Sequence, residues 1–470
     1  MERAAGNRED GRVREPSGPA EPLGADGPGR ASNGPAGSHG ADGQQAPGAP
    51  SGGAGGNAAA SGAGASRAAS CAVPLRTLPD GARISALGLG CMRFPGFATG
   101  HPQARAADAI IARAVERGVN YLDTAWLYPG NEACVGASLE RLGLRDRVML
   151  ATKLPHSSCA SAADFDRYFD ESLARLRTDR VEFYLVHNVT SIAQWERLVN
   201  LGFPAWVARR RAAGRLARIG FSYHGAAGDF ARLLDAYDWD FCQIQYNYAG
   251  EHTQAGTAGL HAAAKRGVAV FVMEPLLGGR LADKLPAAAK RVFAQADARA
   301  GRAPRTPAAW GLAWLWDKPE VSMVLSGMTS PAMVDENCDV AAQAAPGSLS
   351  ADERVEIAQV VELFDRANRV DCTGCGYCLP CPRGVNIPGC FSAYNASFAH
   401  GRLSGMQQYF TASALRSGHP SLASLCVHCG ACERRCPQHI AIPDRLDDVR
   451  RRFQPGPITP LLNRMARKAE

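Results

Sequence analysis

The chain has 470 residues, of which 46% are hydrophobic, so it can bury one large core and a smaller second one. Its formal net charge of +7 is mild, and no basic motif is interleaved with aromatic residues, so we expect no nucleic-acid partner. No apolar run approaches the roughly 20 residues that span a bilayer, and the amino terminus lacks the pattern of a secretory signal. We therefore expect a cytoplasmic protein without a membrane segment.

The amino-terminal segment is rich in Gly, Ala, Pro and Ser. Residues 1–70 contain no Ile, Phe, Trp, Tyr or Cys. Such a segment cannot bury enough apolar surface to offset its ordering entropy. We predict a disordered tail over residues 1–72, either a linker or the product of a misplaced start codon.

Strands and helices are expected to alternate over residues 73–345, after a hairpin whose turn is Asp80-Gly81. Amphipathic helices are predicted near residues 106–117, 165–176 and 260–266. Eight such units in one domain favour a (β/α)8 TIM barrel, an α/β fold. The eight strands are predicted to begin near Leu87, Val119, Val148, Val181, Ala217, Phe241, Val268 and Val321.

A doubly wound open sheet is the alternative fold for this alternation. That fold would place a glycine-rich phosphate loop after the first strand, leading into a helix. The segment after Leu87 lacks the third glycine and continues into Phe94-Pro95 instead. The barrel is therefore the better interpretation.

Polar residues close three consecutive predicted strands. Asp123 ends the strand near Val119, with Tyr128 five residues later, while Lys153 and His187 end the next two strands. Because the carboxyl ends of barrel strands share one face, these four side chains are predicted to form one site. Each residue alone could be structural, as an ion pair or a buried histidine, but the set points to catalysis.

This ordered set resembles the catalytic tetrad of the aldo-keto reductases. The resemblance covers about residues 74–342 and implies hydride transfer between a nicotinamide and a small carbonyl or alcohol. It assigns Tyr128 as the acid, Lys153 as the group that lowers its pKa, Asp123 as the partner of the lysine, and His187 as a donor to the carbonyl. By the same resemblance four residues contact the cofactor: Ser222 and Gln243 at the carboxamide, Glu336 and Asn337 at the adenine.

Four positions depart from the family pattern. Tyr223 stands where the family usually has an asparagine, and Met273 replaces the aromatic side chain that stacks on the nicotinamide. Met333 and Gly327 occupy positions that usually carry an arginine and a lysine for the 2′-phosphate. NADPH is the expected cofactor by family, with NADH as the alternative. Trp126, Phe94 and Phe97 are predicted to line an apolar substrate pocket.

Nine of the 15 cysteines lie between Cys372 and Cys436, behind a helix that is predicted to begin at a Ser350 cap. The downstream cysteine run, from Cys426 to Cys436, is C-x2-C-x2-C-x3-C-P, which is the spacing of bacterial ferredoxins. The upstream cysteine run, from Cys372 to Cys381, is one residue shorter. Residues 346–470 are therefore predicted to form a helical linker and a small ferredoxin-like domain with two [4Fe–4S] clusters. Zinc is the rival metal.

In two-cluster ferredoxins the fourth cysteine of a run binds the other cluster. The predicted ligands of the first cluster are Cys372, Cys375, Cys378 and Cys436. The predicted ligands of the second are Cys426, Cys429, Cys432 and Cys381. Cys390 is the alternative to Cys381. The other six cysteines are interpreted as small core or surface residues.

Together the two halves resemble the iron–sulfur subgroup of aldo-keto reductases. The first hypothesis is a reductase whose clusters exchange electrons with the barrel site and with a redox partner protein. The second is an ordinary carbonyl reductase with structural or redox-sensing clusters. The third is a nicotinamide-binding redox sensor without enzymatic activity.

Overall fold

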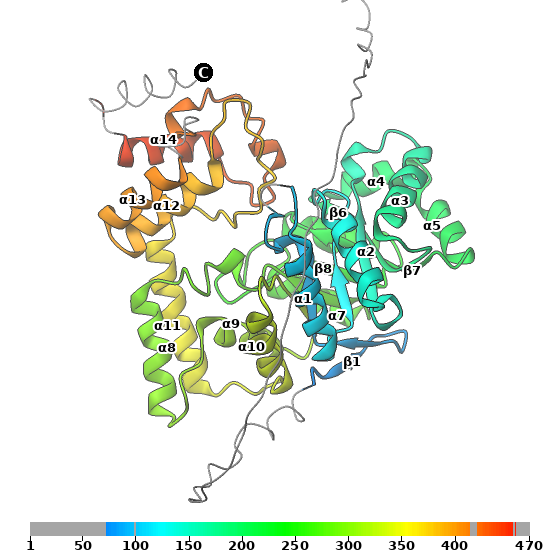
Figure 1. The fold of residues 1–470 in the computed structure, drawn as a ribbon, viewed down its shortest axis with the longest axis horizontal. Helices are drawn as coiled ribbons and strands as arrows, with labels where there is room; N and C mark the ends of the chain where they lie inside the picture. The colour runs from blue at the N-terminus through cyan, green and yellow to red at the C-terminus, as the bar shows by residue number, and fades with distance from the viewer. Residues whose placement is uncertain (1–71, 98–99, 414–420, 455, 457–470) are drawn as a thin grey trace, which may run out of the picture. The chain divides into compact units, whose positions relative to one another are not determined.

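The structure is a computed structural model that describes residues 72–97, 100–413, 421–454 and 456. The prediction of a disordered tail falls on residues outside these ranges, apart from Ala72. Figure 1 shows the course of the chain.

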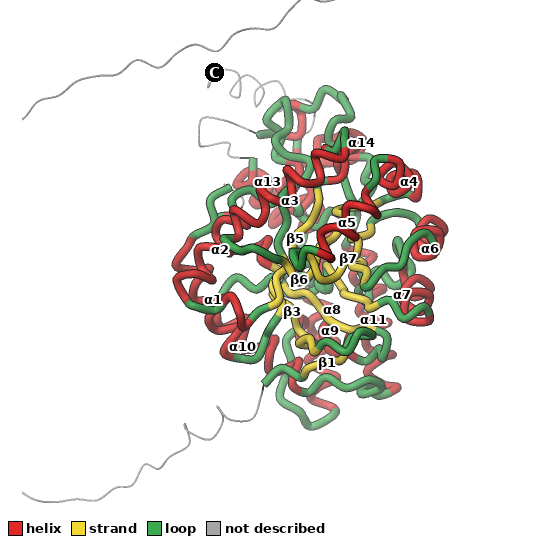
Figure 2. Tube along the Cα trace, turned by 90° about the vertical axis from the view of Figure 1, so that its right-hand side faces the viewer, coloured by secondary structure: helices red, strands yellow, loops and turns green. Residues whose placement is uncertain are grey.

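Eight parallel strands close into a barrel, which confirms the predicted fold. Each strand pairs with its neighbours in sequence, and the last strand pairs with the first to close the ring. Figure 2 shows these strands inside a ring of helices. The strands are β3 (Leu87–Gly90), β4 (Tyr121–Asp123), β5 (Met149–Leu154), β6 (Val181–Val189), β7 (Leu216–Tyr223), β8 (Phe241–Gln245), β9 (Ala269–Met273) and β10 (Val321–Ser326).

The predicted hairpin precedes the barrel. Strands β1 (Leu75–Thr77) and β2 (Arg83–Ser85) pair antiparallel across the Asp80-Gly81 turn. Leu78 and Ile84 pack with the side chains that fill the barrel interior, among them the ring of Phe183. The hairpin therefore covers the amino-terminal end of the barrel and leaves the opposite end for a site.

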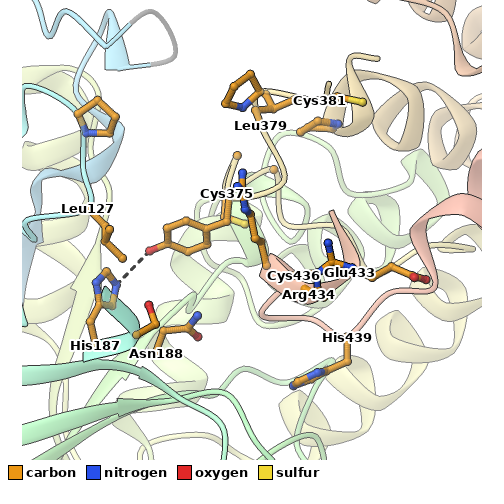
Figure 3. A pocket seen from close by; sticks show the side chains of 18 of the residues that line it. Leu127, His187, Asn188, Cys375, Leu379, Cys381, Glu433, Arg434, Cys436 and His439 are labelled. Atoms are coloured by element: carbon orange, nitrogen blue, oxygen red, sulfur yellow. Dashed lines mark hydrogen bonds between the residues drawn. The ribbon is translucent and has the colours of Figure 1, made fainter. Parts of the chain in front are cut away.

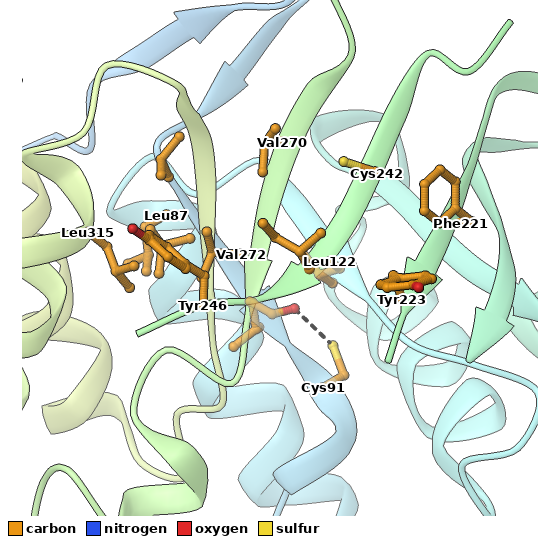
Figure 4. Packing of buried hydrophobic residues seen from close by; sticks show 14 of the residues in the cluster. Leu87, Cys91, Leu122, Phe221, Tyr223, Cys242, Tyr246, Val270, Val272 and Leu315 are labelled. Atoms are coloured by element: carbon orange, nitrogen blue, oxygen red, sulfur yellow. Dashed lines mark hydrogen bonds between the residues drawn. The ribbon is translucent and has the colours of Figure 1, made fainter. Parts of the chain in front are cut away.

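Helices cover the outside of the barrel. Helix α1 shows why: Ala107, Ile110, Ile111 and Ala114 are spaced along one face and all are buried. Figure 4 shows outward-facing strand residues such as Leu122 and Val272 in the layer between strands and helices. The helices are α1 (Ala104–Glu116), α2 (Asn131–Leu142), α3 (Ala162–Leu176), α4 (Ile192–Asn200), α5 (Phe203–Ala212), α6 (Ala227–Asp235), α7 (Gly256–Lys265), α8 (Ala287–Arg299), α9 (Pro307–Trp316) and α10 (Pro331–Ala342).

A long helix, α11 (Ala351–Ala367), leads from the barrel to the cysteine-rich region. Its predicted Ser350 cap is present, since the Ser350 hydroxyl accepts a hydrogen bond from the Glu353 backbone N–H. Glu353 also forms ion pairs with Arg302 and Arg305, next to helix α8, against which α11 packs. Within the described residues no helix has both the length and the apolar character needed to cross a bilayer.

The cysteine-rich region has its own small core. Three helices form it: α12 (Ile387–Ala399), α13 (Arg402–Ala412) and α14 (Ile442–Phe453). Phe391, Tyr409 and Phe453 are fully or almost fully buried there. The cysteine runs themselves lie in backbone without α-helices or strands, at residues 368–386 and 421–441.

Candidate active site

The four residues predicted to form the tetrad meet at the carboxyl-terminal end of the barrel. Asp123 ends β4, and its carboxylate accepts a hydrogen bond from the Lys153 ammonium at 2.5 Å. The same ammonium donates to the Thr124 carbonyl at 2.7 Å and lies 5.0 Å from the centre of the Tyr128 ring. The Tyr128 and His187 rings meet edge to face, with centroids 5.7 Å apart.

Burial decides the protonation of the phenol. Burial raises the pKa of Tyr128 well above its ordinary value, the Asp123 charge adds to this, and a hydrogen bond with Tyr377 opposes it. The sequence predicted the opposite direction, on the basis of the lysine. Burial is the largest cause of the raised pKa of Tyr128, and the ammonium, which is paired with Asp123, does not reverse it. Tyr128 is therefore protonated at neutral pH and able to donate. The role of Lys153 in stabilising the phenolate stays a prediction.

His187 is neutral for the same reason. Burial lowers its pKa well below the ordinary value, and the charges of Lys153, His224 and His156 lower it further. Its Nδ1 has no hydrogen-bond partner within the described residues, while Nε2 lies 3.0 Å from the Tyr377 hydroxyl. A neutral imidazole has one N–H to offer, so His187 can serve as a hydrogen-bond donor rather than as a charge.

The tetrad opens into a cavity of about 260 Å³ that also contains the residues predicted to bind the nicotinamide. The Ser222 hydroxyl accepts a hydrogen bond from the Asn188 N–H at 2.7 Å. The Gln243 side-chain oxygen is buried and has no partner within the described residues. An unpaired buried amide oxygen suits the N–H groups of a carboxamide, so the residues present fit a nicotinamide.

The residues predicted for the adenosine end line the same cavity. Asn337 donates to the Ser326 hydroxyl at 2.8 Å, and Glu336 accepts a hydrogen bond from Thr306. Met333 and Gly327 also line this part of the cavity. The side chain of Tyr223 does not line this cavity. It is buried between the barrel strands and the surrounding helices, and its hydroxyl donates a hydrogen bond to the Ala226 carbonyl.

The assignment of the cysteines to two crossed groups stays a prediction, and the electrostatic neighbours of the thiols bear on it. Burial raises the pKa of the Cys378 thiol, and the charges of three neighbouring cysteines raise it further. Those neighbours are Cys372, Cys375 and Cys436. Three cysteines of the upstream run and the last cysteine of the downstream run are thus close together.

The second group combines the other members of the two runs. Burial raises the pKa of Cys426, and nearby Cys381 and Cys429 contribute. Burial also raises the pKa of Cys432, again with contributions from Cys426 and Cys381. Cys390 is buried within α12, and burial raises its pKa to about 12 without a contribution from another cysteine. These neighbours favour Cys381 over Cys390.

The cysteine loops lie across the mouth of the barrel. Gln438 donates to the Gln245 side chain at 2.8 Å, and the His439 ring contacts the His224 carbonyl at 2.7 Å. Arg93 donates to the Thr373 carbonyl at 3.2 Å. A second cavity, of about 1170 Å³, lies between these loops and His187.

Tyr377 is the site residue that the sequence reasoning missed. It lies between Cys375 and Cys378, and its hydroxyl contacts His187, as the dashed line in Figure 3 shows. The only signal in the sequence was an aromatic residue between two expected ligands, which does not reveal what it faces. Of the three predicted pocket aromatics, only Phe97 lines either cavity; Phe94 is in the core, and Trp126 donates to Glu171.

Comparison with known families decides the identity of the barrel. A model of the aldo/keto reductase family matches residues 86–359, more than half of the chain. The chain belongs to the aldo/keto reductase family. A second family model, a 4Fe-4S dicluster domain, matches residues 371–441, the segment that holds both cysteine runs.

Curated relatives and solved structures agree. An aldo-keto reductase from Mycolicibacterium vanbaalenii is 29% identical over 278 residues, which covers 58% of this chain and 88% of the relative. A Klebsiella pneumoniae aldo-keto reductase in complex with NADPH is 25% identical, with a TM-score of 0.50, covering 62% of this chain and 95% of that one. A Bacillus halodurans aldo-keto reductase in its holo form, 24% identical with a TM-score of 0.50, shares the fold over 61% of this chain and 96% of its own. The protein is an NAD(P)H-dependent oxidoreductase with a 4Fe-4S domain, which removes the sensor without enzymatic activity from consideration.

Proposed function

We propose that the protein reduces a small carbonyl compound with NADPH, or oxidises the corresponding alcohol, at the tetrad. The observation that carries this proposal is the meeting of Tyr128, His187 and the Lys153–Asp123 pair at one end of the barrel. The nicotinamide, when bound, supplies or accepts the hydride. The protein holds the proton on Tyr128, directs the His187 imidazole at the carbonyl oxygen, and offers the free Gln243 oxygen to the carboxamide.

NADPH is proposed as the cofactor because the related Klebsiella structure contains it. Glu336 and Asn337 remain the proposed adenine contacts. Lys153 and Asp123 are proposed to act together: the carboxylate fixes the ammonium beside Tyr128, where its charge stabilises the phenolate that forms once the proton has left. A cytoplasmic location remains part of the proposal.

The tetrad is tested by Tyr128→Phe, which removes one oxygen and keeps the ring. We expect NADPH-dependent turnover in a carbonyl screen to fall at least about a hundredfold, the usual contribution of a positioned acid. NADPH affinity, measured by fluorescence titration, should stay within about twofold. Tyr394→Phe, which makes the same change in helix α12 of the cysteine-rich region, is the matched control. Retained turnover in Tyr128→Phe rules out the assignment.

We further propose that two [4Fe–4S] clusters, held by the two cysteine groups, exchange electrons with a molecule bound at the barrel mouth. Cys375, Cys381 and Cys436 line the same large cavity as His187, which supports this proposal. Cys429 is exposed, so a redox partner protein could approach the second cysteine group from solvent. The alternative is that the clusters are structural or redox-sensing and that the tetrad works without them.

The two roles are separated by an anaerobic titration of cluster-loaded protein with NADPH and then with NADH, without a carbonyl, followed by EPR. A reduced-cluster signal supports electron exchange with the barrel. Clusters that dithionite reduces and NADPH leaves oxidised favour the structural or sensing role. Carbonyl turnover that survives removal of the iron would support the same conclusion.

A further inference from the structure

Tyr377 connects the cysteine-rich region to the tetrad. It follows Cys375 by two residues and precedes Cys378, so the cluster segment carries it directly. Its hydroxyl lies 3.0 Å from His187 Nε2. The Tyr377 and His187 rings meet edge to face, with centroids 6.1 Å apart, and the Tyr128 ring meets the same imidazole edge to face at 5.7 Å. One oxygen from the cluster segment thus takes the hydrogen-bond contact of His187 beside Tyr128.

The contact with His187 belongs to the reacting oxygen in the proposed reaction. A carbonyl oxygen that receives a proton from Tyr128 and a hydrogen bond from His187 must lie within hydrogen-bond distance of both. The Tyr377 hydroxyl already takes the His187 contact beside Tyr128, and like an alcohol product it is an oxygen bonded to one carbon. A carbonyl compound and Tyr377 therefore compete for the same position.

The surroundings show where a competitor can bind. The large cavity borders Tyr377 and is lined by polar side chains, by Cys375, Cys381 and Cys436, and by apolar side chains that include Phe97, Leu127 and Leu379. A large carbonyl compound gains apolar contact area there that offsets the loss of the hydrogen bond between Tyr377 and His187. A two-carbon aldehyde gains almost none.

We propose that Tyr377 determines which carbonyl compounds react, because its hydroxyl occupies the position of the substrate oxygen. The substrates are bulky carbonyl compounds whose remainder fills the cavity between the barrel mouth and the cysteine loops. This inference rests on the proposed carbonyl chemistry. It gives the cluster segment a direct part in substrate selection, whatever electrons the clusters carry.

Two substitutions test the competition in cluster-loaded protein. Tyr377→Phe keeps the ring and removes the hydroxyl, while Tyr377→Ala also opens space. We expect the KM for acetaldehyde and benzaldehyde to fall by about tenfold in both variants, since the hydrogen bond between Tyr377 and His187 no longer has to be broken. The kcat should change by less than about threefold. Tyr394→Phe, in helix α12 away from the tetrad, is the control and should match the wild type.

A binding measurement makes the result independent of turnover. Acetate, a small anion with the oxygen that the tetrad would hold, is titrated calorimetrically into NADP⁺-loaded protein. We expect about tenfold tighter binding to Tyr377→Phe than to the wild type. If acetate binds tighter but no variant reduces any carbonyl, the proposed function fails and the competition stands.

The opposite results overturn the inference and leave the proposed function intact. Unchanged KM and acetate affinity in Tyr377→Phe would mean that the hydroxyl does not occupy the oxygen position. A kcat that falls at least tenfold with unchanged KM would make Tyr377 a proton donor instead. Cluster content by EPR and far-UV circular dichroism confirm that each variant is folded before it is compared.

Discussion

One buried histidine, His187, belongs to the tetrad, and two others, His156 and His224, lie close to it. Burial lowers the pKa of His156 to about 4, that of His224 to about 4, and that of His187 well below its ordinary value, which keeps each in its neutral form. Each lies at or beside a cavity at the barrel mouth. These histidines therefore add no positive charge beside the Lys153–Asp123 pair, and His187 positions a carbonyl through a hydrogen bond.

The burial of His156 predicts that the folded protein loses stability in acid. Because the folded pKa of His156 lies below its unfolded value of 6.5, the unfolded chain binds the extra proton first as the pH falls. Stability is fully present above about pH 6.5 and is lost toward pH 4. We expect the free energy of urea unfolding of the wild type, relative to His156→Gln, to fall by up to about 3 kcal/mol over this window.

The exposed His252 provides the control, since His252→Gln should change with pH as the wild type does. Acid acts on the clusters of the wild type and of each variant alike, so this effect cancels when their free energies of unfolding are compared at the same pH. A constant difference between wild type and His156→Gln from pH 7 to pH 4 would contradict a depressed pKa.

The fourth ligand of the second cysteine group is also decided by single residues. Cys381 contributes to the raised pKa values of Cys426 and Cys432, whereas Cys390 is buried inside helix α12. We expect Cys381→Ser to lower iron and acid-labile sulfide by about half, as one of two clusters is lost, and Cys390→Ser to leave both unchanged. Chemical iron and sulfide analysis of anaerobically purified variants measures this. The reverse pattern would assign Cys390.

At the level of elements, one barrel loop and one cysteine loop pack tightly together. Gly278 follows strand β9 with a φ of +64°, and a Cβ atom built there would lie 2.1 Å from the Thr373 carbonyl oxygen. Its neighbour Gly279 has a similar φ of +86° but open space around it. Thr373 immediately follows Cys372, so the close approach at Gly278 helps to position the first cysteine run.

The pair of glycines gives a matched test. Gly278→Ala and Gly279→Ala introduce comparable backbone strain, of order 1 kcal/mol, but only the first also pushes against Thr373. We expect hydrogen exchange of residues 373–377 to rise at least about tenfold in Gly278→Ala and little in Gly279→Ala. Equal exchange in both variants would show that the contact does not hold the loop.

Periodicity and turn residues predicted the barrel well. The strands begin within two residues of the expected positions, because each is an apolar run bounded by a helix stop or a turn. The Ser350 cap was predicted for the same local reason. The strand ends also placed the tetrad, since parallel strands bring their carboxyl ends to one face.

Contacts between distant segments could not be predicted in this way. Tyr377 and His187 are 190 residues apart, and no local pattern records their contact. The direction of the Tyr128 pKa shift depended on burial that only the folded chain reveals. Trp126 was expected in the substrate pocket, but its ring packs against Tyr168 instead. Loop conformation decides such positions, and residue type alone does not specify it.

At the scale of the whole molecule, the two regions differ in what can hold them together. The barrel has a continuous core between strands and helices, together with a filled interior. The cysteine region has a smaller core, and residues 368–386 and 421–441 lack α-helices and strands. Ligand bonds to clusters would therefore supply much of the stability of those loops, while the barrel does not depend on them.

Removing the metal should separate the two regions. After anaerobic chelation of the iron, we expect residues 368–441 to become sensitive to limited proteolysis while a fragment that contains the barrel persists. Heat capacity scans should show two transitions, with the barrel transition within about 5 °C of that in the loaded protein. NADPH binding, measured on the same sample, should survive because its proposed contacts lie on the barrel. A single transition shifted as a whole would mean that the clusters stabilise both regions together, and the cysteine loops would then be part of the barrel's folding unit rather than a region mounted on it.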